Sequence, residues 1–135
     1  MNLYNEFKNI ENRLAGKEPT IHGGTYYFAV YRLDKSDDII LSLKDYFLKL
    51  EAVNEEDEMI LSVINNPDED IKKICNDWHI EEVLTDRLSE LISTSQGYYR
   101  VCEDYCYLSR GNCGEIFRII ETDNELIILD FYITD

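Results

Sequence analysis

The sequence predicts an α+β domain in which helices pack on one face of an antiparallel sheet of about four strands. Two observations support this fold class. One strand-like run follows a short N-terminal helical pattern, and the C-terminal third has the composition of a strand meander. Between them lie several helix-start signals with apolar residues at helical spacing. The length of 135 residues, without a Pro-rich or Gly-rich linker, favours a single domain over residues 1–135.

The strongest local signal is a β-hairpin at the C-terminal end. Two runs rich in β-branched and aromatic residues, Glu115 to Glu121 and Glu125 to Thr134, flank the turn formers between them. We favour a three-residue loop over 122–124, in which Asn124 takes the left-handed conformation that it tolerates. A two-residue loop is the alternative, and it would place Phe117 opposite Asp130.

The three-residue loop defines a register for this hairpin. It sets Phe117 opposite Leu129, and it puts Arg118 diagonal to Asp130 on the other, half-covered face. One apolar face then forms the buried side of the sheet, and it consists of Phe117, Ile119, Ile127, Leu129 and Phe131.

The N-terminal part predicts one helix and one strand. Apolar residues recur at helical spacing over residues 3–15, before Gly16. After a loop with Pro19, the run Thr25 to Leu33 is rich in aromatic and β-branched residues and predicts a strand that joins the C-terminal meander.

Four helices are predicted between the two strand regions. Ser36 is the expected N-cap of a helix to about residue 52, and Asn54 begins a shorter helix through Ile64. Asn66 before Pro67 starts a third helix, and the fourth runs from about residue 81 toward Gly97. The remaining segment, 98–108, has blurred alternation and is expected to be an edge strand or to carry a bulge.

Charge limits the classes of partner. The chain carries 28 acidic against 13 basic residues, a formal net charge of -15. Such a surface repels nucleic acid and anionic membranes and attracts basic proteins. The N-terminus has neither the basic start nor the apolar run of a signal peptide, and no apolar segment reaches spanning length, so we expect a cytoplasmic protein.

The four cysteines suggest enzyme chemistry only weakly. Cys102, Cys106 and Cys113, with Cys75 or His79, provide ligand types for zinc. If residues 102–106 form a strand, however, the first two cysteines lie about 13 Å apart, too far for one ion. We therefore expect no stoichiometric zinc and no cofactor. The alternative is a cysteine-dependent or metal-dependent enzyme using Cys113 or Cys102 and Cys106, but no complete catalytic constellation accompanies them.

Acidic residues gather at the predicted helix starts, where a carboxylate interacts favourably with the helix dipole. One or two acids satisfy a helix start, so a four-acid run such as 55–58 favours a further role in binding. Alternation also predicts that some of the tyrosines on the strands or at their ends lie on the outer face or at an edge of the sheet. There they are either aromatic anchors for a partner or covered by the first helix. The candidate contact residues are Glu55, Glu56, Asp57, Glu58, Asp68, Glu69, Asp70, Tyr98 and Tyr99.

These observations favour a small acidic binding protein that inhibits or neutralises a basic, nucleic-acid-acting protein such as a toxin, a nuclease or a defence complex. Its carboxylates would lie where the partner expects phosphates. In size, acidity and lack of catalytic apparatus the chain is similar to bacterial immunity proteins and phage-encoded anti-defence inhibitors. The other interpretation is an acidic soluble adaptor, in which the carboxylates only provide solubility.

Overall fold

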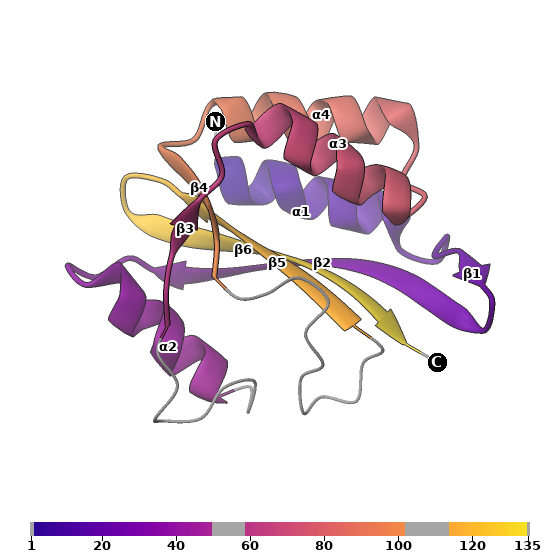
Figure 1. The fold of residues 1–135 in the computed structure, drawn as a ribbon. Helices are drawn as coiled ribbons and strands as arrows, with labels where there is room; N and C mark the ends of the chain where they lie inside the picture. The colour runs from indigo at the N-terminus through magenta and orange to yellow at the C-terminus, as the bar shows by residue number, and fades with distance from the viewer. Residues whose placement is uncertain (1, 50–58, 102–113, 135) are drawn as a thin grey trace.

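The chain folds into a mixture of helices and one antiparallel sheet, as the sequence predicts (Figure 1). In this computed structural model, the structure describes residues 2–49, 59–101 and 114–134. The helices are α1 (Leu3–Leu14), α2 (Ile39–Lys49), α3 (Pro67–Asp77) and α4 (Glu82–Ser93). The strands are β1 (Thr20–Ile21), β2 (Gly24–Asp34), β3 (Ser62–Val63), β4 (Gly97–Arg100), β5 (Gly114–Glu121) and β6 (Glu125–Thr134).

The sheet has six strands in the order β1-β2-β6-β5-β4-β3, so the expected number of about four is too low. The long N-terminal strand β2 pairs with β6 along its whole length, which confirms that it joins the C-terminal strands. The two additional strands, β1 and β3, have two residues each. Segments this short are below the length at which alternation can be recognised.

Helices lie on both faces of the sheet, which corrects the prediction of a single covered face. Figure 1 shows α1, α3 and α4 above the sheet and α2 below it. The upper core joins Trp78, at the end of α3, to Phe131 and neighbouring apolar residues of the sheet. The lower core joins Phe47 of α2 to Phe117 of β5, with ring centroids 4.9 Å apart. Both faces of β5 and β6 are therefore buried.

The hairpin register is that of the two-residue loop, so the favoured three-residue loop is wrong. Phe117 lies opposite Asp130. The Thr122 hydroxyl accepts a hydrogen bond from the Glu125 backbone N–H at 3.2 Å, and the Thr122 N–H donates to the Glu125 carbonyl. These bonds close the turn around Asp123 and Asn124, and Asn124 does not have positive φ.

This register distributes the expected apolar face over both sides of the sheet. Phe117 and Ile119 belong to the lower core, whereas Ile127, Leu129 and Phe131 belong to the upper one. All five are buried, as predicted, but not on one face.

Helix starts follow the local sequence closely. Asn2 and Asn66 cap α1 and α3, each accepting a backbone hydrogen bond from the residue three positions later. In α2 the side chain that accepts such a bond is Asp38 rather than the predicted Ser36. The expected short helix beyond Asn54 is wrong in its described part, since the stretch that includes β3 pairs with β4.

The remainder of the predicted edge strand, residues 102–108, lies outside the described residues. The part that is described forms β4, next to the terminal strand β3. No helix of the described residues is long and apolar enough to cross a membrane.

Candidate functional site

The acidic first turn of α3 divides into an outward and an inward part. Asp68 and Glu69 are exposed. Asp70, one position further along the helix, turns toward the sheet and is only 20% exposed. The three adjacent acids of the predicted contact therefore do not form one surface.

The inward acid Asp70 holds a buried arginine. Arg118 of β5 is 1% exposed, and its Nε and Nη2 donate to the two carboxylate oxygens of Asp70 at 2.8 and 3.0 Å. Tyr98 of β4 donates its hydroxyl proton to the same carboxylate at 2.7 Å. The structure thus brings together two predicted contact residues, Asp70 and Tyr98, but places them inside the molecule, with Tyr98 4% exposed.

Burial and hydrogen bonding act in opposite directions on Asp70. Burial raises the pKa of its carboxyl, but the hydrogen bonds from Arg118 and Tyr98 outweigh burial and hold the pKa below the usual range. Burial and the adjacent carboxylate raise the pKa of Tyr98, so this phenol stays protonated and keeps donating. The cluster is an ionised pair at neutral pH.

The depressed pKa of Asp70 predicts a loss of stability in acid. Its contribution is fully present above the unfolded pKa of about 3.9 and is lost as pH falls through the lower folded-state pKa. In urea unfolding, the difference in free energy between the parent and Asp70→Asn should be constant from about pH 7 to 5 and shrink below about pH 4. A difference that stays unchanged down to about pH 3 would contradict this role.

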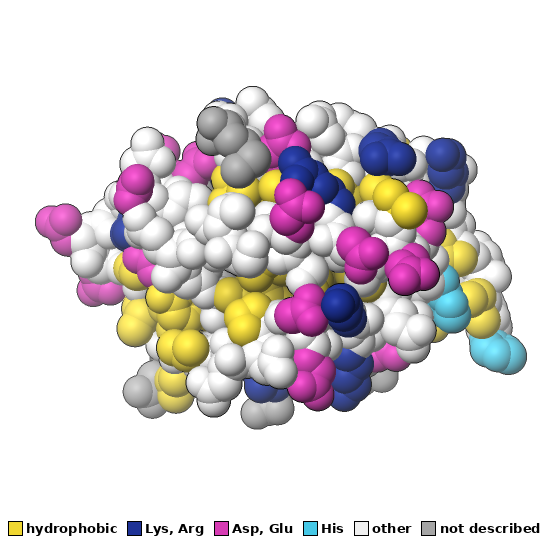
Figure 2. Space-filling view, turned by 90° about the horizontal axis from the view of Figure 1, so that it is seen from above, with side chains coloured by type: hydrophobic (Ala, Val, Ile, Leu, Met, Phe, Trp, Pro, Cys, Tyr) yellow, Lys and Arg dark blue, Asp and Glu magenta, His cyan; other side chains and the backbone are white. Residues whose placement is uncertain are grey.

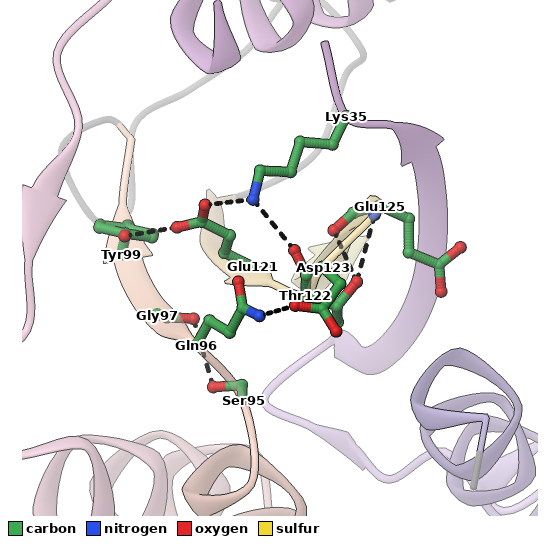
Figure 3. A network of polar contacts seen from close by, with 9 residues as sticks. All are labelled: Lys35, Ser95, Gln96, Gly97, Tyr99, Glu121, Thr122, Asp123 and Glu125. Carbon is green, nitrogen blue, oxygen red and sulfur yellow. Dashed lines mark hydrogen bonds and ion pairs between the residues drawn. The ribbon is translucent and has the colours of Figure 1, made fainter. Parts of the chain in front are cut away.

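Tyr99 belongs to a second polar network, at the end of the sheet where β5 turns into β6 (Figure 3). Its hydroxyl donates to Glu121 at 2.7 Å, and Lys35 contacts the other oxygen of that carboxylate at 2.7 Å. Lys35 also donates to the Thr122 carbonyl at 3.1 Å. These bonds connect β4, the hairpin turn and the end of β2, so Tyr99 has a structural role.

The pKa shifts in this network keep the negative charge on Glu121 and the proton on Tyr99. Hydrogen bonds from Lys35 and Tyr99 lower the pKa of Glu121, and the bond to Glu121 raises the pKa of Tyr99. Tyr99 also folds its ring over Gly97, where a Cβ atom would clash with it. The half-buried ring of Tyr99 is therefore a poor match for the exposed aromatic anchor that the sequence predicted.

The exposed carboxylates lie on the outside of the α3–α4 pair. Figure 2 views the helical layer from outside and shows Asp and Glu side chains spread over it, with Lys and Arg side chains between them. Acidic residues outnumber basic ones over residues 66–94. The exposed members of this acidic surface are Asp68, Glu69, Glu81, Glu82, Asp86 and Glu90. The acidic run 55–58 lies outside the described residues.

The Asp68 carboxylate connects the two helices of this surface. It accepts a hydrogen bond from Ser89 of α4 and forms an ion pair with Lys72 at 3.1 Å. The bonds from Ser89 and then Lys72 lower the pKa of Asp68. This exposed carboxylate therefore keeps its charge well below neutral pH.

Cys75 and His79, two of the candidate zinc ligands, differ in their surroundings, since Cys75 is buried and His79 is exposed. Cys75 is fully buried in the upper core, and burial raises the pKa of its thiol to about 12, which suppresses the reactive thiolate. His79 lies beyond the end of α3 with φ of 60°, so it does not share a helical face with Cys75. Cys102, Cys106 and Cys113 lie outside the described residues. Among the described side chains, no group of three or more could hold a metal ion.

Sequence reasoning missed the buried charges of β5 and β6. Arg118 was placed near Asp130, but the two point to opposite faces, and Glu115 and Asp130 are completely buried. A charged residue within an apolar run indicates a buried ion pair, because a charge is stable inside a protein only when it has bonding partners. The partner of Arg118 could not be identified from the sequence, because Asp70 lies 48 residues away along the chain.

Comparisons with protein-family models, curated proteins and solved structures find no match to this chain.

Proposed function

We propose that this chain is an acidic binding protein that neutralises a basic, nucleic-acid-acting protein by presenting carboxylates in place of phosphates. The observation that supports this proposal most is the outer surface of α3 and α4, with its excess of exposed carboxylates. Basic grooves that bind phosphates attract such a surface over a distance comparable to the Debye length.

The division at the start of α3 makes the proposal more specific. Asp68 and Glu69 face solvent, so a partner can reach them without disturbing the core. Asp70 turns toward the sheet, where its carboxylate is held by the buried Arg118. We therefore assign the contact to Asp68 and Glu69 and remove Asp70, Tyr98 and Tyr99 from it. The run Glu55 to Glu58 remains part of the proposed contact.

The test is a charge reversal on the acidic surface. Asp68→Lys with Glu69→Lys should weaken binding of the basic protein that co-purifies from the native cell, because repulsion replaces attraction. Raising salt from about 0.1 to 1 M shortens the Debye length from about 10 to 3 Å and should weaken the parent complex far more than the variant complex. Binding is measured as Kd at several salt concentrations, after melting confirms that the variant is folded.

The matched control carries the same change of charge on another part of the molecule. Asp34→Lys with Asp37→Lys reverses two exposed acids, one at the end of β2 and one in the loop before α2, and it should bind almost as well as the parent. Reversal of Glu55, Glu56 and Glu58 tests the other half of the contact in the same assay. Equal weakening by the control would mean that only net charge matters. A parent protein that retains no basic partner at low salt would favour the acidic adaptor.

A further inference from the structure

A pocket of about 360 Å³ lies beside the edge of β2, between α1 and the turn that joins α3 to α4. This volume is within the range of about 300–1,000 Å³ that small-molecule sites occupy. Its lining includes Ala15 and Lys17 next to the end of α1, Tyr26 and Phe28 of β2, and Trp78 and His79. It is separate from the acidic surface described above.

The backbone of β2 contributes one donor and one acceptor to this pocket. In an antiparallel sheet, successive residues of a strand direct their N–H and C=O groups to opposite sides. The Tyr26 N–H donates outward to the Pro19 carbonyl, and the Val30 N–H donates outward to Glu11 at 2.8 Å. Phe28 lies between them, so its N–H and C=O point to the same outer side, and no described residue bonds to them.

The neighbouring edge positions are already occupied. Pro19 covers Tyr26, while Lys8 and Glu11 of α1 bind the carbonyl and N–H of Val30. Between these two positions, Phe28 is left without a hydrogen-bond partner among the described residues. A peptide strand that adds to a sheet edge needs several consecutive pairs, so this site accepts a single donor and acceptor pair and disfavours an extended peptide.

One wall of the pocket is aromatic. The Tyr26 ring packs edge to face against Trp78 at 5.5 Å and against His79 at 5.3 Å. His79 has φ of 60°, a conformation that costs a non-glycine residue free energy and that glycine adopts readily. The imidazole ring thus lies beside the pocket on a strained backbone position.

We propose that this pocket binds a small, uncharged planar heterocycle that carries adjacent hydrogen-bond donor and acceptor groups, the chemistry of a nucleobase or nucleoside. The base edge pairs with the N–H and C=O of Phe28, and the ring packs on the aromatic wall of Tyr26 and His79. The charged side chains that line the pocket, Lys8 and Lys17 with Glu11 and Glu18, balance in sign within a chain of net charge -15, which favours the uncharged bases over their phosphorylated forms. This inference does not depend on the proposed protein partner.

Binding is tested with the full chain and the four common ribonucleosides as probes. Trp78 is the only tryptophan of the chain and lines the pocket, so its fluorescence reports occupancy, and equilibrium dialysis confirms it. We expect saturable binding of at least one nucleoside. We also expect weaker binding of its monophosphate and of the derivative methylated on the nitrogen that donates, which is the ring nitrogen in guanosine or uridine and the exocyclic amine, methylated twice, in adenosine or cytidine. Failure of all four nucleosides to bind at millimolar concentration would overturn the proposal, as would equal binding of the methylated form.

Two variants distinguish the pocket from a nonspecific effect. Ala15→Phe fills the pocket from an exposed position and should abolish binding, whereas Asn5→Phe, on α1 away from the pocket, should not. His79→Gly relieves the left-handed strain, so it should melt at the same or a higher temperature yet bind about tenfold more weakly. Unchanged affinity in both Ala15→Phe and His79→Gly would place the binding elsewhere and contradict the assignment.

Discussion

Replacement of Arg118 by alanine is expected to destabilise the fold by about 3–5 kcal/mol, because it leaves the Asp70 carboxylate without its buried partner. Arg118 is 1% exposed and donates two hydrogen bonds to Asp70, and a third from its Nη1 to the Phe117 carbonyl at 2.9 Å. The measurement is the free energy of unfolding in urea at neutral pH. Tyr98→Phe, which removes one hydroxyl from the same carboxylate, should cost only about 1 kcal/mol.

A double-mutant cycle separates the ion pair from the packing of the arginine side chain. Arg118→Leu with Asp70→Leu removes both charges and should be more stable than Arg118→Leu alone, because no uncompensated buried charge remains. If the losses in the free energy of unfolding of the two single variants add up to that of the double variant, Arg118 stabilises the sheet mainly through its aliphatic stem. The ion pair with Asp70 would then not be its main contribution to stability.

The second large effect is expected for Phe131, whose replacement by alanine should cost about 3–5 kcal/mol. Its ring lies in the upper core, 4.9 Å from that of Phe28 and 5.9 Å from that of Trp78. The loss should appear in thermal melting. The fluorescence of Trp78 in the folded variant should change as well, because a cavity opens beside the indole ring.

Phe117→Ala is the matched control on the opposite face of the sheet. Phe117 packs against Phe47 of α2, so its removal should cost a similar amount of stability, about 3–5 kcal/mol, and leave the emission of folded Trp78 unchanged. The same spectral change in both variants would contradict the division into two cores. Melting like the parent in both would contradict the burial of these rings.

The start of α3 could be predicted because its signal is local. The Asn66 side chain bonds a backbone N–H only three residues away, so the sequence pattern contains the whole interaction. The hairpin register could not be determined in the same way. With α2 below the sheet, both faces of β6 are apolar, and the alternation that normally identifies the inward residues is absent.

The candidate site was only partly accessible to sequence reasoning for a related reason. Asp68, Glu69 and Asp70 are chemically alike in sequence, and their different roles follow from the direction in which a helix turns each one relative to Arg118. The pocket beside β2 is also nonlocal, because Tyr26 and Trp78 meet only after the α3–α4 pair has packed on the sheet. A long-range contact of this kind leaves no signature in residue spacing.

The bonds from Lys8 and Glu11 to Val30 have a consequence for how copies of the chain can associate. Sheets propagate into filaments when each molecule offers two open edges, one to receive a neighbour and one to template the next. At Val30 on the edge of β2, a helix supplies the donor and acceptor that a foreign strand would otherwise provide, and the short strand β1 covers only the beginning of β2. A strand from another copy therefore meets an edge that is interrupted at Val30, and an interrupted edge is a poor template for a growing fibril.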